Sequence, residues 1–263
     1  MILVAEMKQA YLIIAHNEFG ILQKLVSALD GAGTDIYIHF DAKVKGLPEI
    51  STTKSRLFIL DNRVNVQWGT VSQIKCELTL FEAVATNRPY DFYHVISGTH
   101  LPLKSTEEIN AYFEDHKGET IVTGLCQDIP YQETLKMRRY NLFLGHSFWW
   151  RAAIAIQRIL HIERNRGRNF YKASNWSSLS QEAMDYILSR KKEILKIYKY
   201  SFCGDEYFVP SELMDSPLKD TVRNDEKYLL HNITRANAAT FKLADLSELK
   251  KTDYLFARKF TSK

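Results

Sequence analysis

The chain has 263 residues, of which 45% are hydrophobic and 12% aromatic, and its net charge is only +4. That content can bury one substantial core, and no apolar run approaches the roughly 20 residues that span a bilayer. Residues 1–6 are too short and too weakly basic for a secretory signal. Cys76, Cys126 and Cys203 lie far apart without metal-ligand spacing, so they favour a reducing compartment and argue against structural zinc. We therefore expect a single cytoplasmic domain over residues 1–263.

The first half of the chain alternates short apolar runs with helical patterns, which is typical of an α/β sheet built from βαβ units. The apolar residues Ile21, Leu25 and Leu29, for example, recur on one helical face. The predicted strands cover residues 10–16, 35–40, 56–60 and 92–96, and the predicted helices cover 18–29 and 69–86.

Polar residues directly follow three of these strands. His16 ends the first, Asp41 follows the second, and Ser97 and Gly98 follow the fourth. Open α/β sheets bind ligands beyond the carboxyl ends of their strands, so these residues should converge on one crevice. We expect a nucleotide to bind in this crevice. The nucleotide-binding half of the chain covers about residues 8–125. His16 can instead be a core histidine with satisfied hydrogen bonds, and Asp41 a capping residue.

The second half, about residues 126–263, is less regular. We expect it to bind an acceptor substrate and to supply catalysis. Ser105 is the expected N-cap of a helix at 106–113. Further helices are predicted at 149–161 and 181–190, strands at 120–123 and 176–179, and a docked segment at 254–260.

A basic and aromatic segment covers residues 136–172, with nine Lys or Arg residues against one acid, Glu163. Phe148, Trp149 and Trp150 lie within it. Three interpretations stay open: contact with an anionic membrane that presents a lipid-linked acceptor, binding of an acidic glycan, or a packed helix whose arginines are solvated.

Two blocks carry groups suited to moving a sugar from a nucleotide donor. Glu206 offers a carboxylate that can take a proton from an acceptor hydroxyl. Arg258 and Lys259 offer cations for a leaving diphosphate. No Asp-x-Asp sequence, which holds the metal in most transferases built on a Rossmann-like sheet, occurs in the chain. We therefore expect side-chain cations to replace a divalent metal, and no cofactor.

Seven blocks in order resemble the family 14 glycosyltransferases, which include core-2 and I-branching β-1,6-N-acetylglucosaminyltransferases and protein xylosyltransferases. They run from Tyr11 to Phe260, and the specificity comes from their order. The blocks are YLIIAHN (11–17), IYIHFDAK (36–43), VQWGTVS (66–72), SGTHLPLKS (97–105), WSSLS (176–180), DE (205–206) and FARKF (256–260).

The resemblance implies a GT-A-like, Rossmann-type fold with a central mixed sheet flanked by helices. It also implies inverting, metal-independent transfer from a UDP-sugar, UDP-N-acetylglucosamine first and UDP-xylose second, to a glycan or lipid-linked acceptor. Glu206 matches the family's catalytic base, and Lys259 matches a lysine that contacts the diphosphate. Arg235 matches a second cation, with a spacing that differs by one residue. The remaining candidates are Arg258 at the diphosphate, and Asp205, Trp176, Arg138 and Lys136 at the acceptor.

The chain departs from the family's pattern in places. His100 stands where branching enzymes have an aspartate, so that contact is lost or replaced by an imidazole. The chain shows neither the anchor nor the cysteines of vertebrate members, which indicates a compact bacterial-type relative. Its acceptor should not be assumed to be a mucin-type glycan.

Simpler interpretations stand beside these. Asp205 and Glu206 can be solvated turn residues, Lys259 can belong to a flexible end, and Trp68 is expected in the core with its indole N–H bonded. Segment 136–172 can belong to a nucleic-acid-binding module. An inactive sugar-binding homologue would bind UDP without transferring anything.

Overall fold

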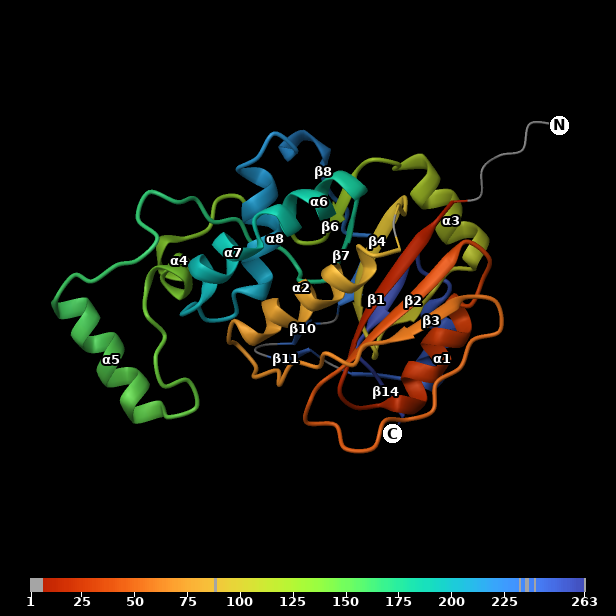
Figure 1. Ribbon diagram of the computed structural model, residues 1–263, viewed down its shortest axis with the longest axis horizontal. Coiled ribbons are helices and arrows are strands. Elements are labelled where there is room, and N and C mark those ends of the chain that lie inside the picture. Colours follow the sequence, from red (N-terminus) through yellow and green to blue (C-terminus); the bar gives the residue numbers. More distant parts are fainter. Residues whose placement is uncertain (1–6, 88, 232, 235–236, 239, 263) are drawn as a thin grey trace.

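The computed structural model describes residues 7–87, 89–231, 233–234, 237–238 and 240–262, and within these ranges seven strands form one central mixed sheet (Figure 1). The first four strands in the order below are mutually parallel, β7 is antiparallel to both of its neighbours, and β8 is parallel to β6. The order is β3 (Arg56–Ile59), β2 (Thr34–Phe40), β1 (Gln9–Ala15), β4 (Phe92–Ser97), β7 (Ser177–Leu179), β6 (Thr120–Val122) and β8 (Val222–Asn224).

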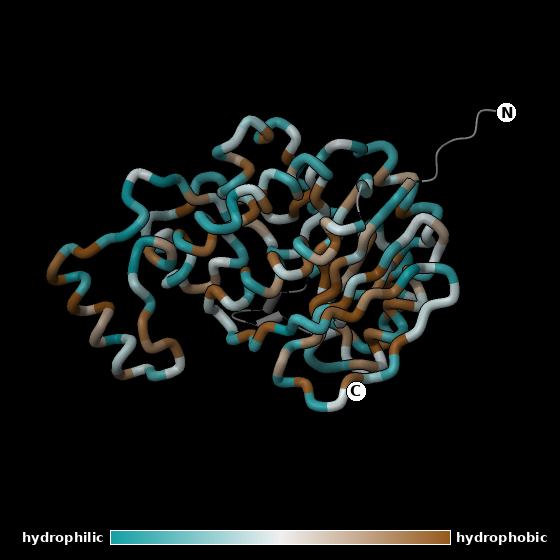
Figure 2. Tube along the Cα trace, in the orientation of Figure 1, coloured by the Kyte–Doolittle hydropathy of each residue, from teal (hydrophilic) through white to brown (hydrophobic). Residues whose placement is uncertain are grey.

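The central strands are buried on both faces. All seven residues of β2 and all six of β4 are buried, and Ile13 of β1 stands opposite Ile38 and Ile96. Figure 2 shows this hydrophobic centre. Near-continuous apolar runs are typical of parallel strands that helices cover on both sides. The predicted α/β class with a mixed sheet flanked by helices is confirmed.

Helices cover the sheet. Helix α2 packs on β1 and β2 and meets α6, α7 and α8, whereas α1 packs beside β5. Ser105 caps α3 in a reciprocal capping box with Glu108, as predicted for Ser105. The helix bounds are α1 (Phe19–Leu29), α2 (Ser72–Val84), α3 (Thr106–Asp115), α4 (Tyr131–Arg138), α5 (Ser147–Ile159), α6 (Gln181–Ser189), α7 (Lys191–Tyr198), α8 (Asp205–Met214) and α9 (Leu246–Leu249), with 3-10 turns η1 (Lys219–Thr221) and η2 (Leu243–Asp245).

The carboxyl-terminal segment docks onto the turn after β4. Strand β13 lies between β5 and β9, and the Phe260 N–H donates to the Thr99 carbonyl oxygen at 2.9 Å. The terminal basic residues are therefore held close to the end of β4. The small sheets contain β5 (Leu101–Pro102), β9 (Leu229–His231), β10 (Ile233–Thr234), β11 (Asn237–Ala238), β12 (Phe241–Lys242), β13 (Phe256–Arg258) and β14 (Phe260–Thr261).

Helix α5 stands away from the rest of the molecule (Figure 1). Its inner face is held by Gln157, whose amide bonds the backbone of Tyr140 in both directions, at 2.7 and 2.9 Å. The helix predicted at 149–161 is confirmed. None of the helices in the described part of the chain is long and apolar enough to cross a bilayer.

Candidate active site

The carboxyl ends of β1, β2 and β4 meet at one edge of the sheet and form the first wall of a cavity of about 640 Å³. His16, Asp41, Ser97 and Gly98 all line this cavity. Asp41 is buried, and its carboxylate pairs with the Lys43 ammonium at 3.0 Å. The strand order thus brings together the residues that follow three separate strands.

Gly98 serves packing as well as the cavity. Its N–H donates to the Ile14 carbonyl oxygen at 2.9 Å. A Cβ atom at Gly98 would lie 3.2 Å from Ala15 Cβ and 3.3 Å from Leu22 Cδ1. A larger residue would therefore push the turn after β4 away from β1 and α1.

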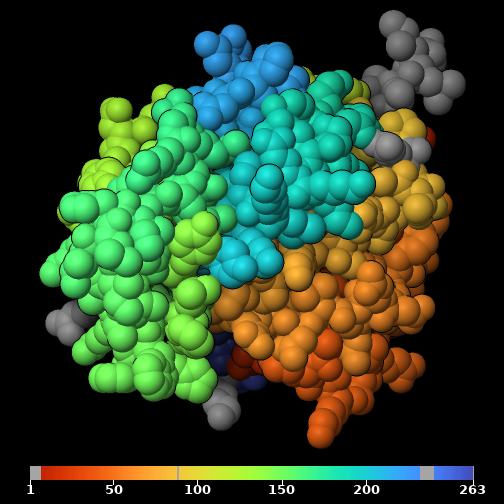
Figure 3. Space-filling view, turned by 60° about the vertical axis from the view of Figure 1, so that its left-hand side comes forward, coloured from red at the N-terminus to blue at the C-terminus, as the bar shows by residue number. Residues whose placement is uncertain are grey.

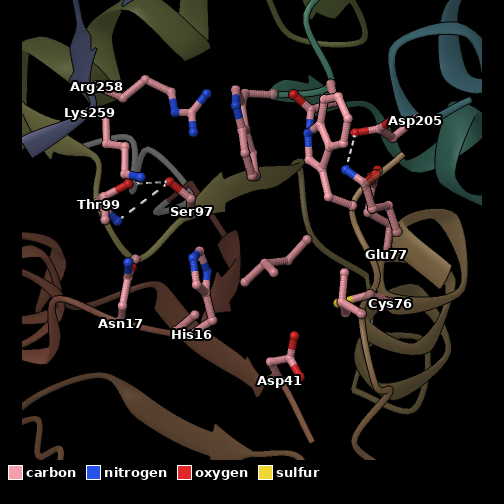
Figure 4. A pocket seen from close by; sticks show the side chains of 18 of the residues that line it. His16, Asn17, Asp41, Cys76, Glu77, Ser97, Thr99, Asp205, Arg258 and Lys259 are labelled. Atoms are coloured by element: carbon pink, nitrogen blue, oxygen red, sulfur yellow. Dashed lines mark hydrogen bonds between the residues drawn. The ribbon is translucent and has the colours of Figure 1, made fainter. Parts of the chain in front are cut away.

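Arg258 and Lys259, at the end of β13, form a second wall (Figure 4). Arg258 Nη1 donates to His231 Nε2 at 3.2 Å, and burial lowers the pKa of Arg258 to about 10, which leaves it charged at neutral pH. Burial and the Lys259 ammonium lower the pKa of His16, so its imidazole is neutral there. Among the described residues no carboxylate forms an ion pair with Arg258 or Lys259. Two cations thus face the cavity without a counter-ion from that part of the protein.

Glu206 lies in the first turn of α8, where the helix dipole favours a carboxylate. Its side chain is 39% exposed, and Oε2 lies 3.3 Å from Lys172 Nζ. The Glu206 carbonyl oxygen accepts from the Ala173 N–H at 3.0 Å. The Glu206 carboxylate is therefore held beside Lys172, and it lines the cavity, where a bound substrate can contact it.

Two buried acids, Asp205 and Glu77, line the same cavity as Glu206. Burial, with the charge of Glu206, raises the pKa of Asp205 to about 7. Asp205 Oδ2 accepts from Gln73 Nε2 at 2.6 Å. Burial, with the charge of Asp205, raises the pKa of Glu77 well above its ordinary value. In Figure 4 these two carboxyl groups lie across the cavity from Arg258 and Lys259.

The charged groups of the cavity suit two different parts of a reaction. The cavity is lined by cations suited to phosphate oxygens and by the partly exposed carboxylate of Glu206, which can accept a proton. Within the described ranges, no three His, Cys, Asp or Glu side chains gather where they could hold a metal ion.

A model of the Core-2/I-Branching enzyme family matches residues 9–248. The chain belongs to this family. The resemblance predicted from the sequence blocks is confirmed. Arg258 and Lys259 lie beyond the matched residues.

A curated relative supports the same family. Human N-acetyllactosaminide β-1,6-N-acetylglucosaminyl-transferase is 26% identical over 122 residues, which cover 44% of this chain and 30% of the human protein. The match thus spans less than a third of that relative's length.

Two solved structures show a weak likeness. Mouse xyloside xylosyltransferase 1 in its apo form has a TM-score of 0.37 at 10% identity, over 84% of this chain and 87% of its own. Core-mannan synthase A from Aspergillus fumigatus, in an Mn/GDP form, has a TM-score of 0.43 at 11% identity, over 83% and 75%.

The predicted core position of Trp68 is wrong. It was expected in the core, but its side chain is 74% exposed at the cavity and stands edge-on to Phe202, with ring centroids 5.3 Å apart. Gly69 follows it with φ of +75°, and a Cβ there would lie 2.6 Å from Phe202 Cε2. The turn therefore needs glycine and directs the indole outwards.

His100, which replaces the family's aspartate, lies behind the cavity wall. It is fully buried, and its Nδ1 accepts from the Ser97 N–H at 3.0 Å. Its ring stands edge-on to Trp176, with centroids 5.1 Å apart. Burial and Arg258 lower its pKa well below the ordinary value, so a neutral imidazole supports Ser97 and Trp176 from behind.

The remaining candidates lie in different places. Trp176 and Asp205 line the cavity, whereas Lys136 and Arg138 do not. The Lys136 ammonium pairs with Glu133 at 2.8 Å. The Arg138 guanidinium donates to the carbonyl oxygens of Asn165 and Arg168, at 3.2 and 2.9 Å, and thereby holds the 165–168 loop. Arg235 lies outside the described residues.

Glu77 is one of the cavity-lining residues that the sequence did not single out. Ile74, Leu78 and Phe81 mark the inner face of α2, and Glu77, three residues after Ile74, falls on the same face. An acid inside an apolar stripe is the signal that could have found it.

Proposed function

We propose that this protein transfers N-acetylglucosamine from UDP-N-acetylglucosamine to an acceptor hydroxyl, with inversion at the anomeric carbon and without a divalent metal. One observation carries the proposal: Glu206, Arg258 and Lys259 line one cavity. Among the described residues, neither of the two cations forms an ion pair with a carboxylate, and Glu206 lies beside Lys172. UDP-xylose is the second candidate donor. The family membership and the human relative support a sugar transferase. The cavity offers a carboxylate for the proton and two cations for the diphosphate.

The reaction follows from these positions. Glu206 takes the proton of the acceptor hydroxyl as the hydroxyl oxygen attacks the anomeric carbon. The new carbon–oxygen bond forms while the bond from that carbon to the diphosphate breaks, and UDP leaves as an anion. Attack from the face opposite the diphosphate inverts the configuration.

Arg258 and Lys259 stabilise the negative charge that develops on the leaving diphosphate. Fixed cations in a cleft poor in water do this without reorganisation at the moment of reaction. We propose that they replace a divalent metal, which predicts that EDTA leaves the initial transfer rate unchanged. Strong inhibition by the chelator, reversed by added manganese, would overturn this part of the proposal.

Contact of segment 136–172 with an anionic membrane is a further part of the proposal. Phe148 and Trp149 are 72% and 61% exposed, and Arg151 and Arg158 are also exposed on the same helix. A polyanion-binding protein that uses this segment is the rival. It predicts steeply salt-dependent binding to nucleic acid and no effect of UDP.

Glu206→Gln tests the base directly. We expect transfer to fall by roughly two orders of magnitude or more, while the Kd for UDP stays unchanged. Glu248→Gln is the matched control, because Glu248 is an exposed acid in a surface pair with Lys251. A Glu206→Gln enzyme that transfers at the wild-type rate would remove Glu206 from the mechanism. A thermal-shift screen of nucleotide sugars in EDTA identifies the donor.

A further inference from the structure

A second cavity, of about 510 Å³, lies beside the catalytic one, and Trp68 lines both. Its lining is mostly aromatic and aliphatic, with hydroxyl and amide groups, and no charged side chain of the described residues lines it. The lining residues are Gln67, Trp68, Thr70, Leu144, Gly145, Ser147, Trp150 and Phe202. A cavity of this composition suits hydrocarbon better than a free saccharide or a polyanion.

One wall of this cavity is tied to the catalytic turn. Phe202 comes four residues before Glu206, and the Cys203 N–H donates to the Gly69 carbonyl oxygen at 2.9 Å. The Gly69 N–H in turn donates to Gln73 Oε1, and the amide of Gln73 bonds Asp205. A group held against Phe202 and Trp68 is therefore held next to the turn that carries Glu206.

The other wall is the first turn of α5, which supplies Ser147 and Trp150. The Trp150 indole N–H donates to Asn141 Oδ1 at 3.4 Å, so its ring faces the body of the protein. Phe148 and Trp149 of the same turn are exposed, and Ile156 and Ile159 extend this exposed apolar face along the helix. Figure 3 shows a hollow between the green surface that includes α5 and the orange surface of the segment before α2.

We propose that the second cavity is an apolar acceptor subsite and that the acceptor is an amphiphile. Its hydroxyl-bearing head lies at Glu206, and the hydrocarbon chain attached to that head lies between Trp68, Phe202 and Trp150. The exposed apolar face of α5 starts at the same turn, so the chain can pass into this cavity from a lipid surface on which α5 rests. This inference rests on the proposed function, because it extends the acceptor side of the same site.

Alkyl glycosides test it as probes. Methyl, butyl, hexyl and octyl β-galactosides, each below its micelle concentration and with UDP present, are titrated by calorimetry and by tryptophan fluorescence. Each added methylene that enters the cavity is expected to tighten binding by up to about fourfold. Equal affinities across the series would overturn the inference.

Ser147→Trp fills the mouth of the cavity, and we expect it to reduce the octyl-to-methyl affinity ratio at least tenfold. Ala155→Trp, on an exposed position of the same helix, is the matched control and should keep the wild-type ratio. If Ser147→Trp also keeps that ratio, the chain binds elsewhere and the subsite is wrong. Should Ser147→Trp fail to fold, the wild-type series decides alone. UDP-sugar turnover measures the proposed function separately. An enzyme that transfers sugar but binds all the alkyl glycosides equally well would contradict only the subsite.

Discussion

The guanidinium of Arg258 lies 4.8 Å from the centroid of the Trp176 ring, and Nε of Arg258 is buried without a hydrogen-bond partner among the described residues. The indole face and His231 therefore hold the cation in place without neutralising it. A cation prepared in this way keeps its charge for an incoming anion. Two segments about 80 residues apart in sequence, around Trp176 and Arg258, thus build one half of the proposed anion site.

Trp176→Leu removes this support. A cation–π contact contributes about 0.5–2 kcal/mol, so we expect UDP to bind roughly 2- to 30-fold more weakly. Isothermal titration with UDP measures the effect, and Trp176→Phe should recover part of it because it keeps a ring. Trp149→Leu, an exposed position on α5, is the control for the loss of an indole. Wild-type UDP affinity in Trp176→Leu would show that the ring does not position Arg258.

Lys259→Ala removes one of the two cations. Hydrogen bonds to charged groups contribute about 1.5–3 kcal/mol, so the Kd for UDP should rise about 10- to 150-fold and transfer should slow. Magnesium should not restore either quantity, whereas Lys259→Arg should retain most of both. Lys251→Ala is the matched control, since Lys251 is a surface lysine paired with Glu248. Full rescue of Lys259→Ala by magnesium would contradict the role given to Lys259.

The strands of the first half could be predicted from the sequence because they depend on local periodicity. Apolar runs followed by polar residues mark strands and their carboxyl ends, so the convergence of His16, Asp41 and Ser97 follows once the strands are parallel. The carboxyl-terminal block could be predicted as docked because Phe256 and Phe260 flank its cations, and both rings are fully buried.

Other parts could not be predicted from such patterns. Helix α8 was not predicted because it is buried nearly all round, mixes acidic and apolar residues without a helical period, and contains Pro210. The outward direction of Trp68 depends on Phe202, more than 130 residues away in the chain, which fills the space beside Gly69. The raised pKa of Glu77 likewise depends on burial and on Asp205, neither of which its own neighbours in the sequence reveal.

Asp205→Asn should stabilise the protein increasingly as pH rises. The pKa of this carboxyl group is about 7 when folded, against 3.8 for an ordinary aspartate. Between these values the unfolded chain binds fewer protons than the folded protein, so the wild type loses stability as pH rises from about 4 to 7 and then levels off. The variant lacks this loss, and its advantage in unfolding free energy should grow by about 1–4 kcal/mol from pH 4 to pH 8. Urea unfolding at both pH values measures it. Asp128→Asn, at an exposed position, should show no such change, and an advantage of Asp205→Asn independent of pH would contradict the raised pKa.

Glu77→Gln tests the second buried acid. Both carboxyl oxygens of Glu77 are buried without a hydrogen-bond partner in the described part of the chain. Because its pKa is raised, the folded protein holds a proton on Glu77 at pH values where the unfolded chain has lost it. The stability of the wild type therefore falls as pH rises above about 4.5.

The glutamine variant keeps the shape of Glu77 and carries no charge at any pH. We expect its Tm to exceed that of the wild type at pH 8 and to match it more closely at pH 5, and thermal unfolding at the two pH values measures this. Glu82→Gln is the control, because Glu82 lies on the same helix in an exposed pair with Lys191. If Glu77→Gln instead loses stability at pH 8, Glu77 is ionised in the folded protein and has a cationic partner.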